Sequence, residues 1–299
     1  MINKLFEAMY YKKSDSYEQV TVPFHGFTKR IMKDKINCWE WRGEIMVTFC
    51  SDVDGTLIYY VNRLMEFPEW VPLQCKNQFM TKESHRLLQE VRQKVEFLPV
   101  TARSVEKYGE IAEDLGNPNF ALVCNGAVLL ADGEIVTEWL QESKTLAEKS
   151  EKDFDKVIAF CKEQPSVKKI TWEQGVRILI TTSNTRKLRE KLTASLDLNT
   201  VDLWIAGSVL EVVPKGLTKG EAVRRWREQF APKFLVAAGN GEIDFTMADH
   251  AEVLLVPDIL ASKVHSSNVK VVQGVFSDGV LREVLDIAKS REKEEGGVI

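Results

Sequence analysis

Two acidic residues, Asp52 and Asp54, stand one residue apart in the stretch FCSDVDGTLIYY, directly after an apolar run. Carboxylates this close repel each other, and removing them from water is costly. A positive charge between them would offset both costs. The two acids, followed at once by Gly55 and Thr56, therefore indicate a site that holds a cationic group.

Polar side chains also follow three other apolar runs that have the pattern of strands. Thr101 follows VEFLPV, Asn125 follows FALVC, and residues 240–244 follow FLVAAG. In a parallel sheet, ligands bind at the carboxyl ends of the strands. We therefore expect these strand ends and the acid pair to converge on one crevice.

Helical patterns separate these strands, as a parallel sheet requires. Residues 82–95 place four apolar side chains on one helical face, and a second helix is expected to begin at Ser104 and end at Gly116. A hairpin turn is expected at Asp132 and Gly133. The alternation predicts an α/β fold with a Rossmann-like parallel sheet covered by helices on both faces.

The middle of the chain has a different rhythm. Two helical patterns, FDKVIAFCKEQ and NTRKLREKLTASL, alternate with two hairpin-like pairs, VKKITW with VRILITT about Gly175, and VDLWIAG with VLEVVP. This predicts an α+β cap (lid) domain at residues 135–211, inserted between the core-domain segments 46–134 and 212–299.

Two segments do not follow this scheme. Residues 1–45 lack clear periodicity and are predicted to be an N-terminal extension. The aromatic-rich connection from Tyr59 to Met80 is either a functional flap or a local packing loop.

The composition is that of an ordinary soluble protein, with 44% hydrophobic and 28% charged residues. A formal charge of −4 argues against nucleic acid or an anionic membrane as a partner. No apolar window has the length of a membrane span and no signal peptide is evident, so we expect a cytoplasmic protein. The five cysteines include no CxxC pair and the four histidines no HExxH spacing, which argues against a disulfide framework and a zinc site.

Four motifs, in chain order, resemble those of the haloacid dehalogenase (HAD) superfamily, in particular its Cof-like subgroup of type IIB. SDVDGTL resembles the first motif, D-x-D-G-T, and VTARS the second, a Thr or Ser that ends a strand. PKGLTKGEAV resembles the third, a lysine that opens a helix, and GNGEIDFTM the fourth, G-D-x-x-N-D-x-x-M. The resemblance extends from about Met46 to near the C-terminus, and it implies a HAD core with an inserted α/β cap.

The resemblance implies a Mg²⁺-dependent phosphatase that hydrolyses a small phosphate ester, such as a sugar phosphate, through an aspartyl-phosphate intermediate. Asp52 would be the nucleophile, and Asp54 would protonate the leaving group and then activate water. Thr101 would donate a hydrogen bond to a phosphate oxygen. Lys219, with Lys215 as the alternative, would neutralise charge on the phosphate and on Asp52.

By the same resemblance, the Mg²⁺ ligands would be a carboxylate oxygen of Asp52, the backbone carbonyl of Asp54 and the side chain of Asn240. Asn240 stands where the family has an acid, so it offers a carbonyl oxygen but one negative charge fewer, which weakens metal affinity. Asp244 is also assigned to the metal site, and either Glu242 or Asp244 could take over part of the missing acid's role.

Substrate contacts are assigned to Arg103 and Asn125, although a turn residue after a strand is the favoured alternative for Asn125. Motif two has Ala102 where the subgroup commonly has Gly, and motif four has Ile243 where it has Asn.

Two other functions stay open. The changes at Asn240 and Ile243, together with the N-terminal extension, would fit a HAD-fold protein that serves as a binding or regulatory module. Return of the phosphoryl group to a bound sugar would instead make the protein a phosphomutase. A binding module has no need to keep a nucleophile beside an acid, so the pair Asp52 and Asp54 favours an enzyme.

Overall fold

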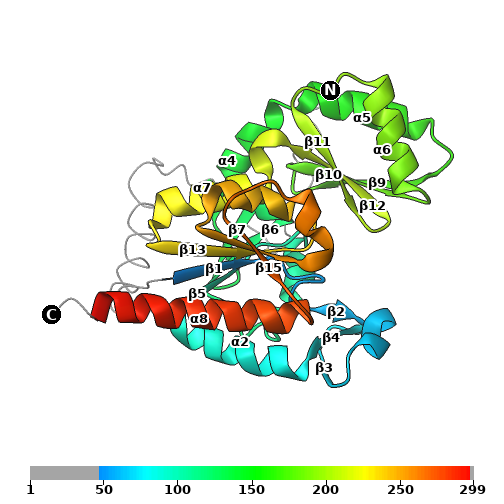
Figure 1. Ribbon diagram of the computed structural model, residues 1–299. Coiled ribbons are helices and arrows are strands. Elements are labelled where there is room, and N and C mark those ends of the chain that lie inside the picture. Colours follow the sequence, from blue (N-terminus) through cyan, green and yellow to red (C-terminus); the bar gives the residue numbers. More distant parts are fainter. Residues whose placement is uncertain (1–46, 297–299) are drawn as a thin grey trace, which may run out of the picture. The chain divides into compact units, whose positions relative to one another are not determined.

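A five-stranded parallel sheet, in the order β15-β14-β13-β1-β5, forms the middle layer of the fold (Figure 1). The computed structural model describes residues 47–296, so the predicted extension at residues 1–45 lies outside the described residues. The strands are β1 (Val47–Ser51), β5 (Glu96–Pro99), β13 (Phe234–Ala238), β14 (Val253–Pro257) and β15 (Val269–Val272). A parallel bridge from Val100 to Leu122 leads on to β6 (Phe120–Val123). The predicted α/β fold with a parallel sheet is confirmed.

Helices cover both faces of this sheet, which is why β13 and β14 are apolar along their whole length. Figure 1 shows α7 (Lys219–Phe230) on one face and α2 (Lys82–Lys94) with α8 (Phe276–Gly296) on the other. Every residue of β1 is buried. The predicted helical face of α2 is present, because Leu87, Leu88 and Val91 are buried.

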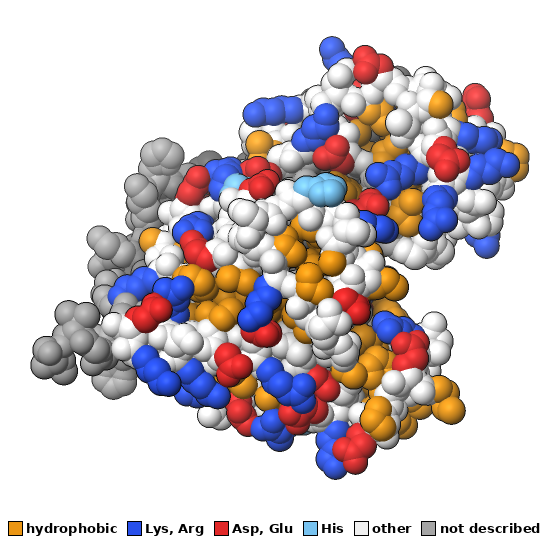
Figure 2. Space-filling model, viewed as in Figure 1, with side chains coloured by type: hydrophobic (Ala, Val, Ile, Leu, Met, Phe, Trp, Pro, Cys, Tyr) orange, Lys and Arg blue, Asp and Glu red, His pale blue; other side chains and the backbone are white. Residues whose placement is uncertain are grey.

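The connection after the acids folds into a small antiparallel sheet. It contains β2 (Tyr59–Tyr60), the 3-10 helix η2 (Val61–Glu66), β3 (Trp70–Pro72) and β4 (Gln78–Thr81). Its inner face packs as an aromatic cluster of Tyr59, Phe67 and Phe79. Its outer face leaves Met65 97% exposed and Trp70 44% exposed, and hydrophobic side chains gather over this region in Figure 2.

The second predicted helix is shorter than expected. The side chain of Ser104 caps α3 (Val105–Gly109), as predicted, by accepting a hydrogen bond from the backbone of Lys107. The α-helix ends at Gly109 rather than at Gly116. Beyond it the backbone hydrogen bonds are irregular, spanning three residues from Gly116 N to Glu113 O, four from Leu115 N to Ile111 O and five from Asn117 N to Ala112 O, so this segment continues as turns.

The predicted hairpin at Asp132 and Gly133 is present between β7 (Val128–Ala131) and β8 (Glu134–Ile135). Both turn residues have positive φ, 51° and 82°, as a tight hairpin turn of this kind requires.

The middle of the chain forms a separate antiparallel sheet, in the order β11-β12-β10-β9. The strands are β9 (Val167–Glu173), β10 (Arg177–Thr182), β11 (Val201–Ala206) and β12 (Val209–Pro214), and the helices of this region are α4 (Thr137–Glu148), α5 (Glu151–Lys162) and α6 (Thr185–Ser195). Both predicted hairpins are present, and Gly175 has a φ of 72° in the first. This is the element content predicted for the inserted cap; the domain boundaries themselves stay a prediction.

No helix within residues 47–296 combines the length and apolar character that crossing a bilayer requires.

Candidate active site

Asp52 lies directly after β1, at the carboxyl end of the parallel sheet. Its backbone N–H donates to the carbonyl of Ala238 at 2.9 Å, so the pairing of β1 with β13 holds the acid in place. The side chain is 8% exposed, and its carboxylate accepts two hydrogen bonds. Lys219 Nζ lies 2.6 Å from Oδ1, and Thr56 Oγ1 lies 3.0 Å from Oδ2.

Lys219 is the lysine that reaches this acid. It is the first residue of α7, which begins after Thr218, whose side chain accepts a hydrogen bond from Glu221 N. Its ammonium group is buried and also lies 2.6 Å from Asp244 Oδ1, so that it bridges two carboxylates. Burial lowers the pKa of Lys219, but the charges of Asp244 and Asp52 outweigh burial and raise it above its ordinary value. The Lys219 side chain that bridges the two carboxylates is therefore positively charged.

One ammonium group does not compensate both carboxylates. Burial and, next, the charge of Asp244 raise the pKa of Asp52 to about 7, even though Lys219 lowers it. Among the described residues, the negative charge around Asp52 thus exceeds the positive charge. A further cation would offset this excess.

Asp54 is held by Arg103. The turn that carries Asp54 depends on Gly55, which has a φ of 81° and donates a backbone hydrogen bond to Ile58 O. Arg103 Nε lies 2.8 Å from Asp54 Oδ2, and Nη2 lies 2.7 Å from Oδ1. The side chain of Arg103 is 8% exposed and that of Asp54 30% exposed. Arg103, predicted as a substrate contact, thus has an acid of the site as its partner here.

The ends of β5 and β6 meet beside these acids, as predicted. Thr101 is fully buried, and its Oγ1 accepts a hydrogen bond from Arg103 N at 3.2 Å. Asn125 has a φ of 59° and donates its backbone N–H to Thr101 O. Its Nδ2 donates to Glu211 Oε2 at 2.6 Å, while its buried Oδ1 has no hydrogen-bond partner among residues 47–296.

Sequence reasoning missed Arg177, which connects β10 to this region. Its side chain is 2% exposed, forms ion pairs with Glu173 and Glu211, and donates to the backbone carbonyl of Ala102. Ala102 stands between Thr101 and Arg103, so Arg177 supports the motif-two loop. The only sequence signal is an acid four residues earlier across the Gly175 turn, which is too common to single out this arginine.

The motif-four loop packs against the Asp52 turn. Asp244 Oδ2 accepts the backbone N–H groups of Asn240 and Gly241 at 2.9 and 2.8 Å. The side chain of Asn240 lies so close to Gly55 that a Cβ on Gly55 would stand 2.1 Å from Asn240 Nδ2. Glu242 is directed elsewhere, since its carboxylate lies 3.2 Å from Arg189.

These residues fit a magnesium ion. Within residues 47–294, no three His, Cys, Asp or Glu side chains are grouped as a metal site by themselves. The Asp52 carboxylate, the Asp54 carbonyl and the Asn240 amide are nevertheless hard oxygen donors, which Mg²⁺ accepts together with water and phosphate. The surplus negative charge at Asp52 favours the same conclusion.

Comparison of the sequence with family models gives one match. Residues 49–164 match the family model of haloacid dehalogenase-like hydrolases. A comparison with curated proteins finds no match.

Solved structures share the fold at low sequence identity. The sucrose-phosphatase of Synechocystis sp. PCC6803, in complex with sucrose and phosphate, has 15% identity and a TM-score of 0.59, over 81% of this chain and 98% of that one. The HAD subclass IIB sugar phosphatase BT4131 has 16% identity and a TM-score of 0.55, over 80% and 98%. The HAD phosphatase BT1666 of Bacteroides thetaiotaomicron has 15% identity and a TM-score of 0.53, over 82% and 96%.

Proposed function

We propose that the chain, of which residues 49–164 match the family model of haloacid dehalogenase-like hydrolases, is a Mg²⁺-dependent phosphatase for a small phosphorylated metabolite such as a sugar phosphate. The observation that carries the proposal is the placement of the buried Asp52 carboxylate between Lys219 and Thr56, two residues before a second acid. Two of the solved structures that share the fold are named as sugar phosphatases, which supports this substrate class.

The first step transfers the phosphoryl group to Asp52. A carboxylate oxygen of Asp52 forms a bond to phosphorus while the bond from phosphorus to the ester oxygen breaks. The electron pair of that bond stays on the leaving oxygen, which takes a proton from Asp54. The products are the free alcohol and an aspartyl-phosphate.

The second step returns Asp52 to its starting state. Asp54, now a carboxylate, takes a proton from a water molecule as the water oxygen attacks phosphorus. The bond from phosphorus to Asp52 breaks, and inorganic phosphate leaves. Asp54 is protonated again for the next cycle.

Asp54 can take part only after its contact with Arg103 changes. A bidentate guanidinium contact stabilises the carboxylate and occupies both oxygens. Binding of a phosphate ester would draw Arg103 toward the new negative charge, which frees Asp54 to take up from solvent the proton that it then passes to the leaving oxygen.

The other residues of the site stabilise charge and position groups. Lys219 places an ammonium group beside Asp52, where negative charge develops on the phosphoryl oxygens, and Asp244 holds that ammonium in place. Thr101 offers a hydroxyl donor to the phosphate. When bound, Mg²⁺ would be held by Asp52, Asp54 and Asn240, with Asp244 beside them, and it would supply further positive charge to the phosphate.

The antiparallel sheet of residues 167–214 would act as a lid. In this proposal, the cap at residues 135–211 closes over the substrate, excludes water and selects the leaving group, while residues 46–134 and 212–299 carry the chemistry.

Phosphate release tests the proposal. We would measure it from aryl, pentose and hexose phosphates, with and without Mg²⁺, for the wild type and for the variants Asp52→Asn, Asn240→Asp and Asp249→Asn. Asp249 is an exposed acid in the 3-10 helix after the motif-four loop, so Asp249→Asn controls for the loss of a nearby charge.

We expect Mg²⁺-dependent release by the wild type and by Asp249→Asn, and a loss of roughly 100-fold or more in Asp52→Asn. Asn240→Asp restores a carboxylate, so it should lower the Mg²⁺ concentration for half-maximal activity by about tenfold. Release that survives Asp52→Asn would refute the aspartyl-phosphate. Release only after Asn240→Asp would favour the binding role, and transfer of phosphate to a second sugar would identify a phosphomutase.

A further inference from the structure

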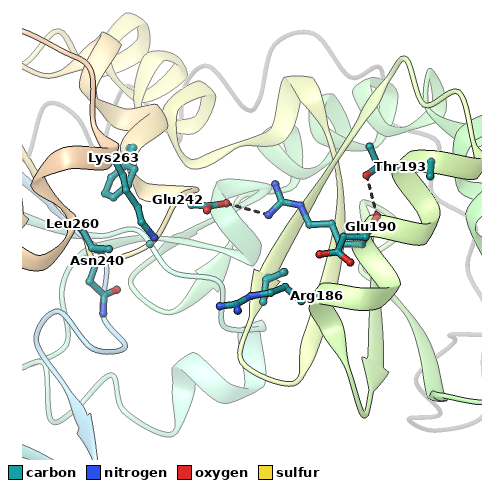
Figure 3. Close-up of a pocket in the computed structure, with 12 residues that line it drawn as sticks. Arg186, Glu190, Thr193, Asn240, Glu242, Leu260 and Lys263 are labelled. Atoms are coloured by element: carbon teal, nitrogen blue, oxygen red, sulfur yellow. Dashed lines mark hydrogen bonds and ion pairs between the residues drawn. The ribbon is translucent and has the colours of Figure 1, made fainter.

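A cavity of about 680 Å³ borders Asn240 and so adjoins the proposed phosphate site. Arg186 and Arg189 of α6 line one side of it. The other side is formed by the motif-four loop and by the 3-10 helix η6 (Asp258–Lys263). Figure 3 shows that Arg186 and Lys263 reach into the cavity from opposite sides.

The cationic side chains that line the cavity outnumber the acidic ones. Three cationic side chains face two acids, Glu190 and Glu242. Arg189 is paired with Glu242 at 3.2 Å. Within the described part of the chain, Arg186 and Lys263 form neither an ion pair nor a side-chain hydrogen bond.

Arg186 and Lys263 are exposed residues that face one open cavity, so the two unpaired cations repel each other across it, and an anion between them removes the repulsion. A guanidinium group can bind a carboxylate or phosphate in a bidentate manner, and an ammonium group adds a compact charge. Apolar side chains of Ile205, Phe245 and Leu260 share the lining, and they would contact a carbon skeleton.

We propose that the substrate carries a second anionic group, a carboxylate or a phosphate, on its leaving group, and that Arg186 and Lys263 bind this group. The inference rests on the proposed function, because it assumes that the phosphoryl group to be removed lies at Asp52. It narrows the substrate class from sugar phosphates in general to doubly anionic ones.

Two matched esters test the inference: glucose 6-phosphate, and 6-phosphogluconate, which carries a carboxylate at the far end. We would compare kcat/KM for both in the wild type, Arg186→Gln, Lys263→Gln and the control Lys187→Gln. Lys187 is an exposed cation of α6 that does not line the cavity. Dissociation constants measured by calorimetry on Asp52→Asn, with and without Arg186→Gln, add a readout that needs no turnover. Glucose 1,6-bisphosphate in the same assays distinguishes a distal phosphate from a distal carboxylate.

We expect at least one doubly anionic ester to be preferred over glucose 6-phosphate by about tenfold or more, which corresponds to one charge-assisted contact. Arg186→Gln and Lys263→Gln should each reduce this preference about tenfold, while Lys187→Gln keeps it. Equal kcat/KM for all three sugar esters would overturn this inference alone. Absence of phosphate release from every ester, the aryl phosphate included, would instead overturn the proposed function, and equal dissociation constants in the calorimetry would then overturn the inference as well.

Discussion

Arg103 and Asp54 form a bidentate ion pair, with nitrogen–oxygen distances of 2.8 and 2.7 Å. The two residues come from separate strand ends, 49 positions apart, and meet beside the buried Asp52 carboxylate. Asp54, the proposed acid and base, is therefore paired with Arg103 before substrate binds. The substrate must compete with Asp54 for the guanidinium group of Arg103.

A double-mutant cycle with Asp54→Asn and Arg103→Gln measures this pairing. We expect a coupling of about 1–3 kcal/mol in the free energy of unfolding, because one partner is nearly buried and both hydrogen bonds are charge-assisted. The same cycle on the exposed pair Arg63 and Glu66 should give a smaller coupling. In activity assays, Asp54→Asn should lower kcat roughly 10²- to 10⁴-fold, and a kcat near that of the wild type would remove Asp54 from the mechanism.

Gly55→Ala should disrupt the contact between the acid turn and Asn240. The added Cβ would stand 2.1 Å from Asn240 Nδ2, at a φ of 81°. Gly133 has nearly the same φ, 82°, and no atom within 4 Å of its added Cβ, so Gly133→Ala reports the backbone cost alone, about 1–2 kcal/mol. Urea unfolding should show a larger loss for Gly55→Ala, and the Mg²⁺ requirement should rise only in that variant. Equal losses would mean that Asn240 moves aside freely.

Arg177→Met should destabilise the protein strongly, because it leaves Glu211 and Glu173 without their buried partner. We expect a loss of about 3–5 kcal/mol in the free energy of unfolding. Arg224→Met is the control: this arginine also pairs with two acids, but at the surface, so its loss should stay within about 1 kcal/mol. Similar losses in the two variants would contradict the assigned role of Arg177.

Asp153 should make stability depend on pH in the acid range. Burial opposes its ionisation, but hydrogen bonds from Lys156, Thr200 and Asn199 outweigh burial and hold its pKa well below the ordinary value. The folded state therefore binds this proton less readily than the unfolded state does. The contribution is complete above about pH 4, near the unfolded pKa, and is lost as the pH falls further.

Unfolding measured from pH 7 down to pH 2 checks this sign. Asp153→Asn should flatten the acid limb of the curve, whereas Asp155→Asn, an exposed neighbour on the same helix, should leave it intact. An unchanged acid limb in Asp153→Asn would assign the pH dependence to other carboxylates.

The sequence alone was sufficient to predict the positions of strands, hairpins and several site residues where local pattern and topology agree. Asp52, Thr101 and Lys219 each follow a strand or open a helix, and a parallel sheet brings such positions together whatever the detailed packing. The strand and hairpin predictions hold for the same reason, because alternating patterns and turn residues act over short distances. Asp132 with Gly133, and Gly175, mark turns that the structure contains.

Contacts that depend on the direction of a side chain could not be predicted from the sequence. Nothing local indicates that Arg103 turns back to Asp54, or that Glu242 faces Arg189 instead of the acids. Arg177 looks like an ordinary strand residue until β10 pairs with β12 and brings Glu211 beside it. The early end of α3 could not be predicted either, since a regular helix and a series of turns can have the same local pattern of side chains.

The pairing of β1 with β13 also determines how late in synthesis the parallel sheet can be completed. Val47 lies beside Phe234, and Ser51 beside Ala238, so the strand that carries the acids has its partner late in the chain. On the ribosome, Asp52 emerges long before this partner or Lys219 exists. The parallel sheet around the acid pair therefore stays incomplete until β13 has been synthesised. A chain released before residue 234 would lack the strand that holds its nucleophile.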